Sequence, residues 1–117
     1  MASFVIDYFE LPTKAMAASQ GFFTKAFGFG SKPYGPAYSE ITEGGVLGGL
    51  NGAAEDQGTA PLIGIRTDDI VAAQRAIEAA GGTITRPVAD YPGGQRFSFR
   101  EPGGNELLVY CPRDEAI

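Results

Sequence analysis

The chain contains no histidine and only one cysteine among its 117 residues. Without imidazole there is no histidine general base, no serine–histidine or cysteine–histidine nucleophile, and no metal site that uses imidazole. A single cysteine cannot form an internal disulfide or a zinc knuckle. Any catalysis therefore depends on carboxylates, tyrosine, lysine or Cys111, and Cys111 has no imidazole base to activate it.

Long apolar runs and an excess of positive charge are also missing. No apolar segment approaches the roughly 20 residues that cross a bilayer, and the first residues lack the basic and then apolar pattern of a signal peptide. Nine basic and 14 acidic residues give a formal net charge of −5, which repels the phosphates of nucleic acids. We therefore expect a cytoplasmic protein that binds neither membranes nor nucleic acids.

What the sequence does contain is a strand, a helix and three further strands. The apolar and aromatic run from Phe4 to Leu11 predicts a buried strand. Helical spacing of apolar residues follows from Ala15 to Phe27 and ends at Gly28. Three short segments punctuated by glycine then predict strands at residues 29–34, 37–43 and 45–51.

The same order then occurs a second time. A strand is predicted at residues 61–67, a helix capped by Asp68 follows, and further strands are predicted at 83–88, 95–100 and 106–110. The halves superpose at an offset of 54 residues, which places Lys32-Pro33 on Arg86-Pro87. We therefore predict one α+β domain over residues 1–117, with module one at 3–51, a linker at 52–59 and module two at 60–111.

Several motifs, taken in order, resemble a known superfamily. They are Tyr8-Phe9-Glu10-Leu11-Pro12, Phe22-Phe23-Thr24-Lys25-Ala26-Phe27-Gly28-Phe29, Thr67-Asp68-Asp69-Ile70, Ala79-Ala80-Gly81-Gly82 and Arg100-Glu101-Pro102-Gly103-Gly104-Asn105. In this order and spacing the chain resembles the vicinal oxygen chelate superfamily, which includes glyoxalase I, bleomycin-resistance proteins and extradiol dioxygenases. The resemblance implies two tandem βαβββ modules that form a cupped sheet around one cavity.

The metal enzymes of this superfamily hold one divalent ion with four side chains, two from each module. Carried over residue by residue, the four positions fall on Tyr8, on Gly48 or Gly49, on Leu62 and on Leu108. Two leucines and a glycine offer no ligand to a cation. The resemblance therefore implies a fold without the inherited metal ligands, and we expect no metal and no cofactor.

Strand alternation predicts which side chains share the cavity face. The candidate ligand-binding residues are Tyr8, Glu10, Leu62, Arg66, Glu106, Leu108 and Tyr110. Asp7 is expected on the opposite face, where Val5, Phe9 and Leu11 should pack against a helix.

Glu10 is the first of these residues to test. A carboxylate on an apolar strand destabilises the fold unless it is paired with a donor or hydrated. It could bind a ligand, act as an acid or base, or pair with Arg66 or Arg96. Arg66 could equally clamp a carboxylate or phosphate group.

Two main classes of function follow, and a structural or regulatory interaction domain is the third. The first is a metal-free protein that holds or sequesters a small organic molecule, similar in logic to the bleomycin-resistance proteins. The alternative is an enzyme of the lyase, isomerase or dioxygenase type. It would use Glu10 and Tyr8 in acid–base chemistry, or bind Mg²⁺ or Mn²⁺ through Glu10, Glu40 and Glu106. The resemblance also implies a homodimer. No catalytic residue is assigned.

Overall fold

The computed structural model describes residues 2–53 and 58–115. It has eight β strands, two α helices and a short 3₁₀ helix, and the order strand, helix, three strands occurs twice. The predicted α+β class and the predicted element order are therefore confirmed. The chain divides into two compact units, Tyr8–Leu62 and Met1–Asp7 with Ile63–Ile117. Of the predicted linker, residues 54–57 lie outside the described residues.

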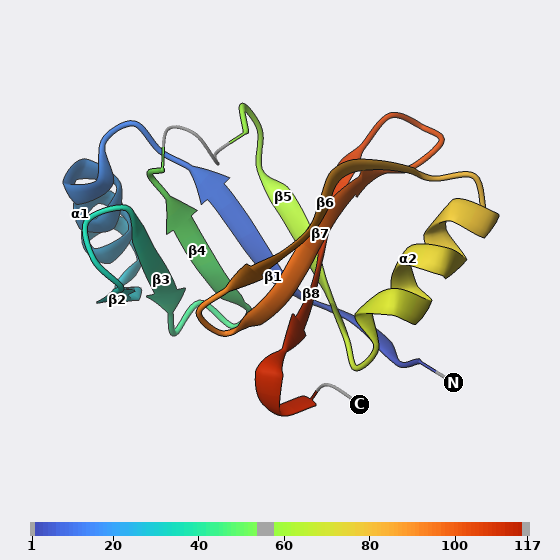
Figure 1. Cartoon of the computed structure of the whole chain (residues 1–117). Helices are drawn as coiled ribbons and strands as arrows, with labels where there is room; N and C mark the ends of the chain where they lie inside the picture. Colours follow the sequence, from blue (N-terminus) through green and yellow to red (C-terminus); the bar gives the residue numbers. More distant parts are fainter. Residues whose placement is uncertain (1, 54–57, 116–117) are drawn as a thin grey trace. The chain divides into compact units, whose positions relative to one another are not determined.

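The first unit is a four-stranded sheet with one helix (Figure 1). Its elements are β1 (Phe4–Pro12), α1 (Met16–Phe27), β2 (Gly30–Pro33), β3 (Tyr38–Thr42) and β4 (Leu47–Asn51). The strands lie in the order β2-β3-β4-β1, where β1 is parallel to β4 and the other neighbours are antiparallel. The residues of β1 before Tyr8 belong to the second unit.

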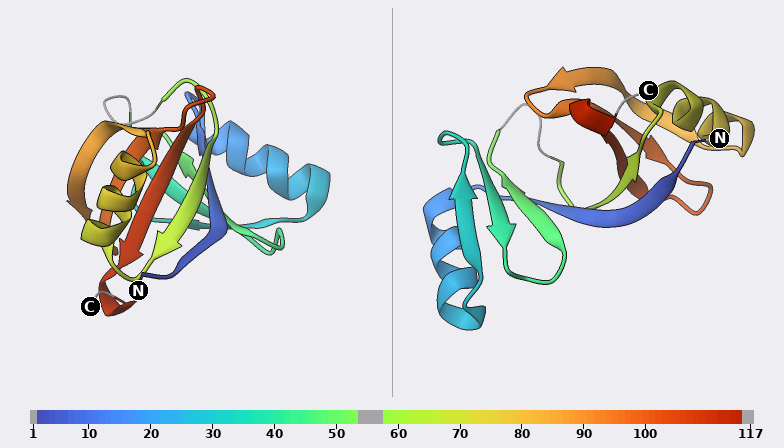
Figure 2. Two further views of the ribbon diagram at one scale, coloured as in Figure 1. Left: turned by 90° about the vertical axis from the view of Figure 1, so that its right-hand side faces the viewer. Right: turned by 90° about the horizontal axis from the view of Figure 1, so that it is seen from below.

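The second unit repeats this topology. Its elements are β5 (Leu62–Thr67), α2 (Ile70–Ala79), β6 (Thr83–Tyr91), β7 (Gly94–Arg100), β8 (Glu106–Pro112) and the 3₁₀ helix Arg113–Glu115. The strands lie in the order β5-β8-β7-β6, with β5 parallel to β8 and the other neighbours antiparallel. In Figure 2, α1 lies beside the strands of the first unit and α2 beside those of the second.

One face of the second sheet packs against α2 and forms the core of this unit. The buried members of this cluster are Ile70, Ala73, Phe97, Phe99, Val109 and Cys111. Alternation in β7 and β8 puts Phe97, Phe99, Val109 and Cys111 on the face toward α2, while their sequence neighbours Ser98, Leu108 and Tyr110 point to the other face. The strand period therefore separates an apolar helix-facing layer from a more polar face.

Helix α2 begins one residue later than the sequence suggested. Asp69, not Asp68, is the N-cap, and its side chain accepts a hydrogen bond from the backbone N–H of Ala72. Asp68 instead accepts a hydrogen bond of 2.9 Å from the backbone N–H of Ser3. Either of two adjacent aspartates could cap the helix. Asp69 has the extended backbone geometry of an N-cap residue, and its side chain therefore reaches the backbone N–H of Ala72, three residues later.

The turn between β7 and β8 is held by its own glutamate. The Glu101 carboxylate accepts hydrogen bonds from the backbone N–H of Gly103 at 2.6 Å and of Asn105 at 3.1 Å. These backbone bonds hold the pKa of the Glu101 carboxyl below its ordinary value. Arg100 donates to the Gly104 carbonyl at 2.9 Å. The motif at 100–105 thus stabilises a tight turn.

Helix α1 is packed much less deeply than its apolar spacing suggested. None of its residues is buried, and Phe22 and Phe27 are 59% and 60% exposed. Their rings contact those of Phe23 and Phe29 in an aromatic cluster. Val5, expected to pack against a helix, is also exposed. The aromatic side chains of α1 therefore remain largely exposed.

The second core gives a matched test of burial. Val109→Ala removes two methyl groups from a side chain that is 1% exposed, whereas Val71→Ala changes an exposed side chain of α2. We expect Val109→Ala to lower the free energy of unfolding by about 2–3 kcal/mol, because transfer and cavity terms add. Val71→Ala should change it by less than about 0.5 kcal/mol. Urea unfolding followed by circular dichroism measures both, and equal losses would contradict the described core.

Candidate functional site

A buried carboxylate lies at the centre of a polar cluster in the first unit. The side chain of Glu10 is only 3% exposed. One of its oxygens accepts a hydrogen bond from the Asn51 amide at 3.2 Å, and the other accepts one from the Tyr38 hydroxyl at 3.4 Å. The Tyr38 hydroxyl is also in close contact with that of Tyr8. A chain of hydroxyl groups thus leads from Tyr8 to the buried carboxylate.

A glycine on β4 makes room for this chain. Gly49 lies opposite Glu10 on β1 and opposite Glu40 on β3. A Cβ atom at Gly49 would collide with the hydroxyls of Tyr38 and Tyr8. Gly49 is therefore a close-packing glycine, where any side chain would displace the tyrosines.

The opposite face of the same strands is apolar. The ring of Phe9 packs directly on Gly48, and it would collide with a Cβ atom at that position. Leu11 on β1 and Leu50 on β4 line a groove with residues of α1. Tyr8 and Glu10 therefore lie on the face away from α1, as strand alternation predicted.

The direction of the hydrogen bonds gives the cluster its chemistry. A carboxylate without its proton can only accept, so the Tyr38 hydroxyl donates to Glu10. The oxygen of Tyr38 is then polarised to accept a hydrogen bond, and Tyr8 is placed to donate to it. At the outer end of this chain the oxygen of Tyr8 is an acceptor backed by a buried negative charge. Such a chain suits a ligand that donates hydrogen bonds.

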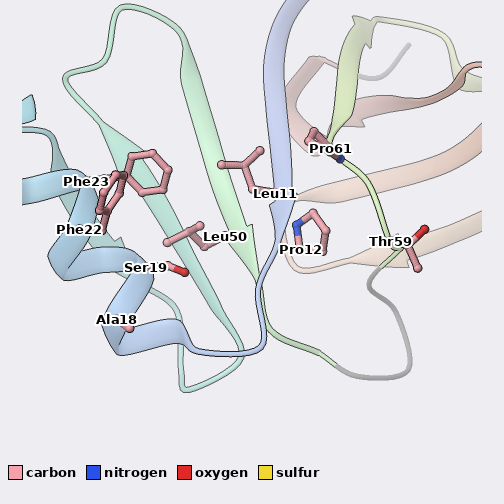
Figure 3. Close-up of a pocket in the computed structure, with 9 residues that line it drawn as sticks. All are labelled: Leu11, Pro12, Ala18, Ser19, Phe22, Phe23, Leu50, Thr59 and Pro61. Carbon is pink, nitrogen blue, oxygen red and sulfur yellow. The ribbon is translucent and has the colours of Figure 1, made fainter. Parts of the chain in front are cut away.

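A groove lies on the other face of the first unit, between α1 and the ends of β1 and β4 (Figure 3). It has a volume of about 540 Å³ and is lined by Leu11, Pro12, Ala18, Ser19, Phe22, Phe23, Leu50, Thr59 and Pro61. The hydroxyl groups of Ser19 and Thr13 form a hydrogen bond of 2.7 Å. None of the lining residues is titratable, and none is a predicted site residue. The groove is thus apolar and separate from the Glu10 cluster.

The second unit holds another polar cluster around Asp7. One oxygen of Asp7 lies 2.9 Å from Nε of Arg66, and the other accepts a hydrogen bond from the Tyr110 hydroxyl at 2.6 Å. Burial, with this hydrogen bond as the next cause, raises the pKa of Tyr110 well above its ordinary value. Tyr110 therefore stays protonated and donates to Asp7 at neutral pH.

The expectation that Asp7 lies apart from Arg66 and Tyr110 is wrong. Its carboxylate contacts both of these side chains. The physical reason is that a carboxylate among apolar residues is costly unless donors reach it, and the guanidinium of Arg66 does so. The expected pairing of Glu10 with Arg66 or Arg96 stays a prediction.

The other predicted site residues are placed as follows. Leu62 is half-buried, and Leu108 is 1% exposed. Glu106 accepts a hydrogen bond from the Thr85 hydroxyl at 2.6 Å. Among the described residues no three acidic or cysteine side chains come together in a group that could hold a metal ion. Glu10, Glu40 and Glu106 therefore do not form such a group among the described residues.

The residues at the family's metal positions do not fit a divalent ion. At Gly49 the space that a ligand side chain would need is filled by two tyrosine hydroxyls. Leu108 and Leu62 present hydrocarbon, and Tyr8 is engaged with Tyr38.

Tyr38 and Asn51 are the site residues that sequence reasoning missed. Both stand at ends of their strands, opposite each other in the register of β3 and β4. The sequence did contain one indication, because Asn51 is a polar residue at the end of an apolar, glycine-rich strand. In the structure the Asn51 side chain is only 3% exposed. Such a side chain needs a hydrogen-bond partner.

No helix of the described residues is long and apolar enough to span a membrane.

Gly49→Ala tests the packing of the tyrosine hydroxyls. The added methyl must displace Tyr8 and Tyr38, so we expect a loss of about 1–3 kcal/mol in the free energy of unfolding. The control is Gly21→Ala on α1, where a Cβ meets nothing within 4 Å. This change should stabilise the protein by about 0.5–1 kcal/mol. Denaturation followed by tyrosine fluorescence suits a chain without tryptophan. Stabilisation by Gly49→Ala would contradict the geometry.

Comparisons with known proteins agree with this fold. Residues 5–109 match the family model described as Glyoxalase/Bleomycin resistance protein/Dioxygenase superfamily. The chain is similar to the structure of a superfamily member from Vibrio splendidus 12B01, with 24% identity, a TM-score of 0.65, and coverage of 96% of this chain and 99% of that one. Comparison with curated proteins gives no match.

Two further structures share the fold. A Mn(II)-bound glyoxalase from Novosphingobium aromaticivorans is 22% identical, with a TM-score of 0.66 and coverage of 95% of this chain and 39% of that one. A structure described as an NAD-dependent benzaldehyde dehydrogenase from Legionella pneumophila is 15% identical, with a TM-score of 0.76 and coverage of 92% and 99%. Because the family model spans nearly the whole chain, this protein belongs to the glyoxalase/bleomycin resistance protein/dioxygenase superfamily.

Proposed function

We propose that this chain is a small-molecule-binding protein that works without a metal ion and holds a cationic organic ligand. The site is the face of β1, β3 and β4 that carries Tyr8, Glu10, Tyr38 and Asn51. The single observation that carries the proposal is the hydroxyl chain from Tyr8 through Tyr38 to the buried carboxylate of Glu10. It supplies acceptor oxygens and one fixed negative charge.

Three further features support a cationic ligand. A carboxylate in a partly dry environment attracts a cation more strongly than one in water, since the effective dielectric constant is lower. Aromatic rings such as those of Tyr8 and Tyr38 add cation–π attraction. The net charge of −5 favours the approach of cations over anions from a distance.

The enzyme alternative uses the same residues. A lyase or isomerase would pass a proton along Tyr8 and Tyr38 to Glu10, and the hydrogen-bonded chain is the observation in its favour. Such a reaction also needs a group that stabilises the charge developing on the substrate. Binding needs only the acceptor chain, so we place binding first and an enzyme of the glyoxalase type second.

We also propose that the protein is a cytoplasmic homodimer. The support is the number of large apolar side chains that are exposed on both units, because such side chains mark interaction surfaces when they gather. The exposed side chains are Phe4, Val5, Ile6 and Ile63 in the second unit and Phe22, Phe27, Val46 and Leu47 in the first. Sedimentation equilibrium should give twice the chain mass of 12.3 kDa. A mass of one chain at millimolar concentration would contradict the dimer.

Binding of benzylamine tests the proposed site. We expect its titration into the wild-type protein to shift the ring resonances of Tyr8 and Tyr38 in NMR spectra. Glu10→Gln keeps the shape of the side chain but removes its charge, so the dissociation constant should rise at least tenfold, or about 1.4 kcal/mol. Benzyl alcohol has a similar shape without the charge and should bind the wild-type and variant proteins equally weakly.

The matched control is Glu78→Gln, which removes a carboxylate exposed on α2. It removes one negative charge, as Glu10→Gln does, and should leave benzylamine affinity within twofold. Equal affinity of the wild-type and Glu10→Gln proteins would overturn the proposal, as would the absence of any shift at Tyr8 and Tyr38.

A further inference from the structure

Asn51 lies where three segments of the first unit meet. It is the last residue of β4, directly opposite Pro12 on β1 and Tyr38 on β3. Its backbone carbonyl accepts a hydrogen bond of 2.9 Å from the backbone N–H of Thr13. The residue is almost wholly buried, so its side-chain amide needs partners within the protein.

Two hydrogen bonds fix which way the amide of Asn51 is turned. Its oxygen, Oδ1, accepts from the backbone N–H of Ala53 at 2.9 Å, and its nitrogen, Nδ2, donates to Oε2 of Glu10 at 3.2 Å. An amide oxygen only accepts, and an amide nitrogen only donates. Turning the amide over would therefore break both bonds, because its nitrogen would face an N–H and its oxygen would face a carboxylate. The backbone turn at Ala53 thus selects the donor end of the amide for Glu10.

The carboxylate of Glu10 is held at both of its oxygens. Asn51 binds Oε2 from β4, and the hydroxyl of Tyr38 binds Oε1 from β3. The last torsion of a glutamate side chain is broad, so a single donor leaves the plane of the carboxylate loosely defined. A second donor on the other oxygen defines this plane. Asn51 therefore determines where Oε1 lies, and with it where the hydroxyl chain to Tyr8 begins.

We propose that Asn51 is a positioning residue of the proposed cation site, which acts on the ligand through Glu10 and not by direct contact. This role rests on the proposed function, because it belongs to the residue that orients the charged group of that site. An amide suits the role since it is uncharged. It binds Oε2 without adding a positive charge that would repel a cationic ligand. The charge selectivity of the site therefore depends on Asn51, although Asn51 itself carries no charge.

The chain has two asparagines, and the other one provides a matched control. The side-chain amide of Asn105 donates to Oε2 of Glu101 in the exposed turn between β7 and β8 of the second unit. The same kind of bond thus occurs once in the buried cluster and once in an exposed turn. Replacement by serine removes the amide donor at either position. A serine hydroxyl still accepts from the backbone N–H two residues later, so Asn51→Ser keeps the turn at Ala53.

Titration of benzylamine and of benzyl alcohol, followed by NMR of the tyrosine rings, tests the role of Asn51. In Asn51→Ser the carboxylate of Glu10 loses its fixed plane but keeps its charge, so the dissociation constant of benzylamine should rise about fivefold or more. That of benzyl alcohol should stay within about twofold, whereas a general disturbance of the site would weaken both compounds alike. Asn105→Ser should leave both constants within about twofold.

An unchanged benzylamine constant in Asn51→Ser would overturn the positioning role, and so would an equal rise for benzyl alcohol. Neither result bears on the proposed function, which is decided by the wild-type and Glu10→Gln proteins.

The side-chain amide signals of Asn51 test the same role without a ligand and without a variant of Asn51. They should shift in the NMR spectrum of Glu10→Gln, where the charged acceptor is lost, while the amide signals of Asn105 should not. Unmoved Asn51 signals would overturn the inference.

The coupling between Glu10 and Tyr38 gives a second measurement without a ligand. A double-mutant cycle of Glu10→Gln and Tyr38→Phe, measured by urea unfolding, should show a coupling of about fivefold with Asn51 present and of about twofold or less in Asn51→Ser. The same coupling in both backgrounds would overturn the inference. If benzylamine fails to bind while the amide shift and the change in coupling are observed, the proposed function is overturned and Asn51 still orients Glu10.

Discussion

A carboxylate removed from water must be held by hydrogen-bond donors, and the first unit is arranged around meeting that requirement for Glu10. The amide of Asn51 and the hydroxyl of Tyr38 supply the donors, from β4 and β3 respectively. They can do so only if β1 and β4 are paired so that Gly49 lies opposite Glu10, because any side chain there would displace the tyrosines. Since a shift of one residue turns every side chain to the other face, the same register sends Leu11 and Leu50 toward α1.

The two units share one topology, but the charged side chains on their polar faces are mainly acidic in the first unit and mainly basic in the second. Each has a helix on one face of a four-stranded sheet and a more polar face on the other side. In the first unit that face carries Glu10 and Glu40, and in the second it carries Arg66, Arg86 and Arg96. A repeated fold fixes where side chains point but not what they are, so function is determined by the residues placed on the scaffold.

The sequence predicted the elements well because their signals are local. Apolar periodicity and glycine turns located the described strands and both helices to within a few residues, and so placed Tyr8, Glu10 and Arg66 on strands. The partners of these residues were not predictable in the same way. Asp7, Tyr38 and Asn51 join the clusters through neighbouring strands, and that depends on register and side-chain reach. Periodicity contains no information on either.

The hydroxyl chain depends most directly on the coupling between Glu10 and Tyr38. A double-mutant cycle with Glu10→Gln, Tyr38→Phe and the combined variant, each unfolded in urea, measures that coupling separately from the other effects of each change. We expect a coupling free energy of about 1 kcal/mol or more, in keeping with a hydrogen bond to a charged group. Losses that simply add would contradict the hydroxyl chain, and with it the acceptor site at Tyr8.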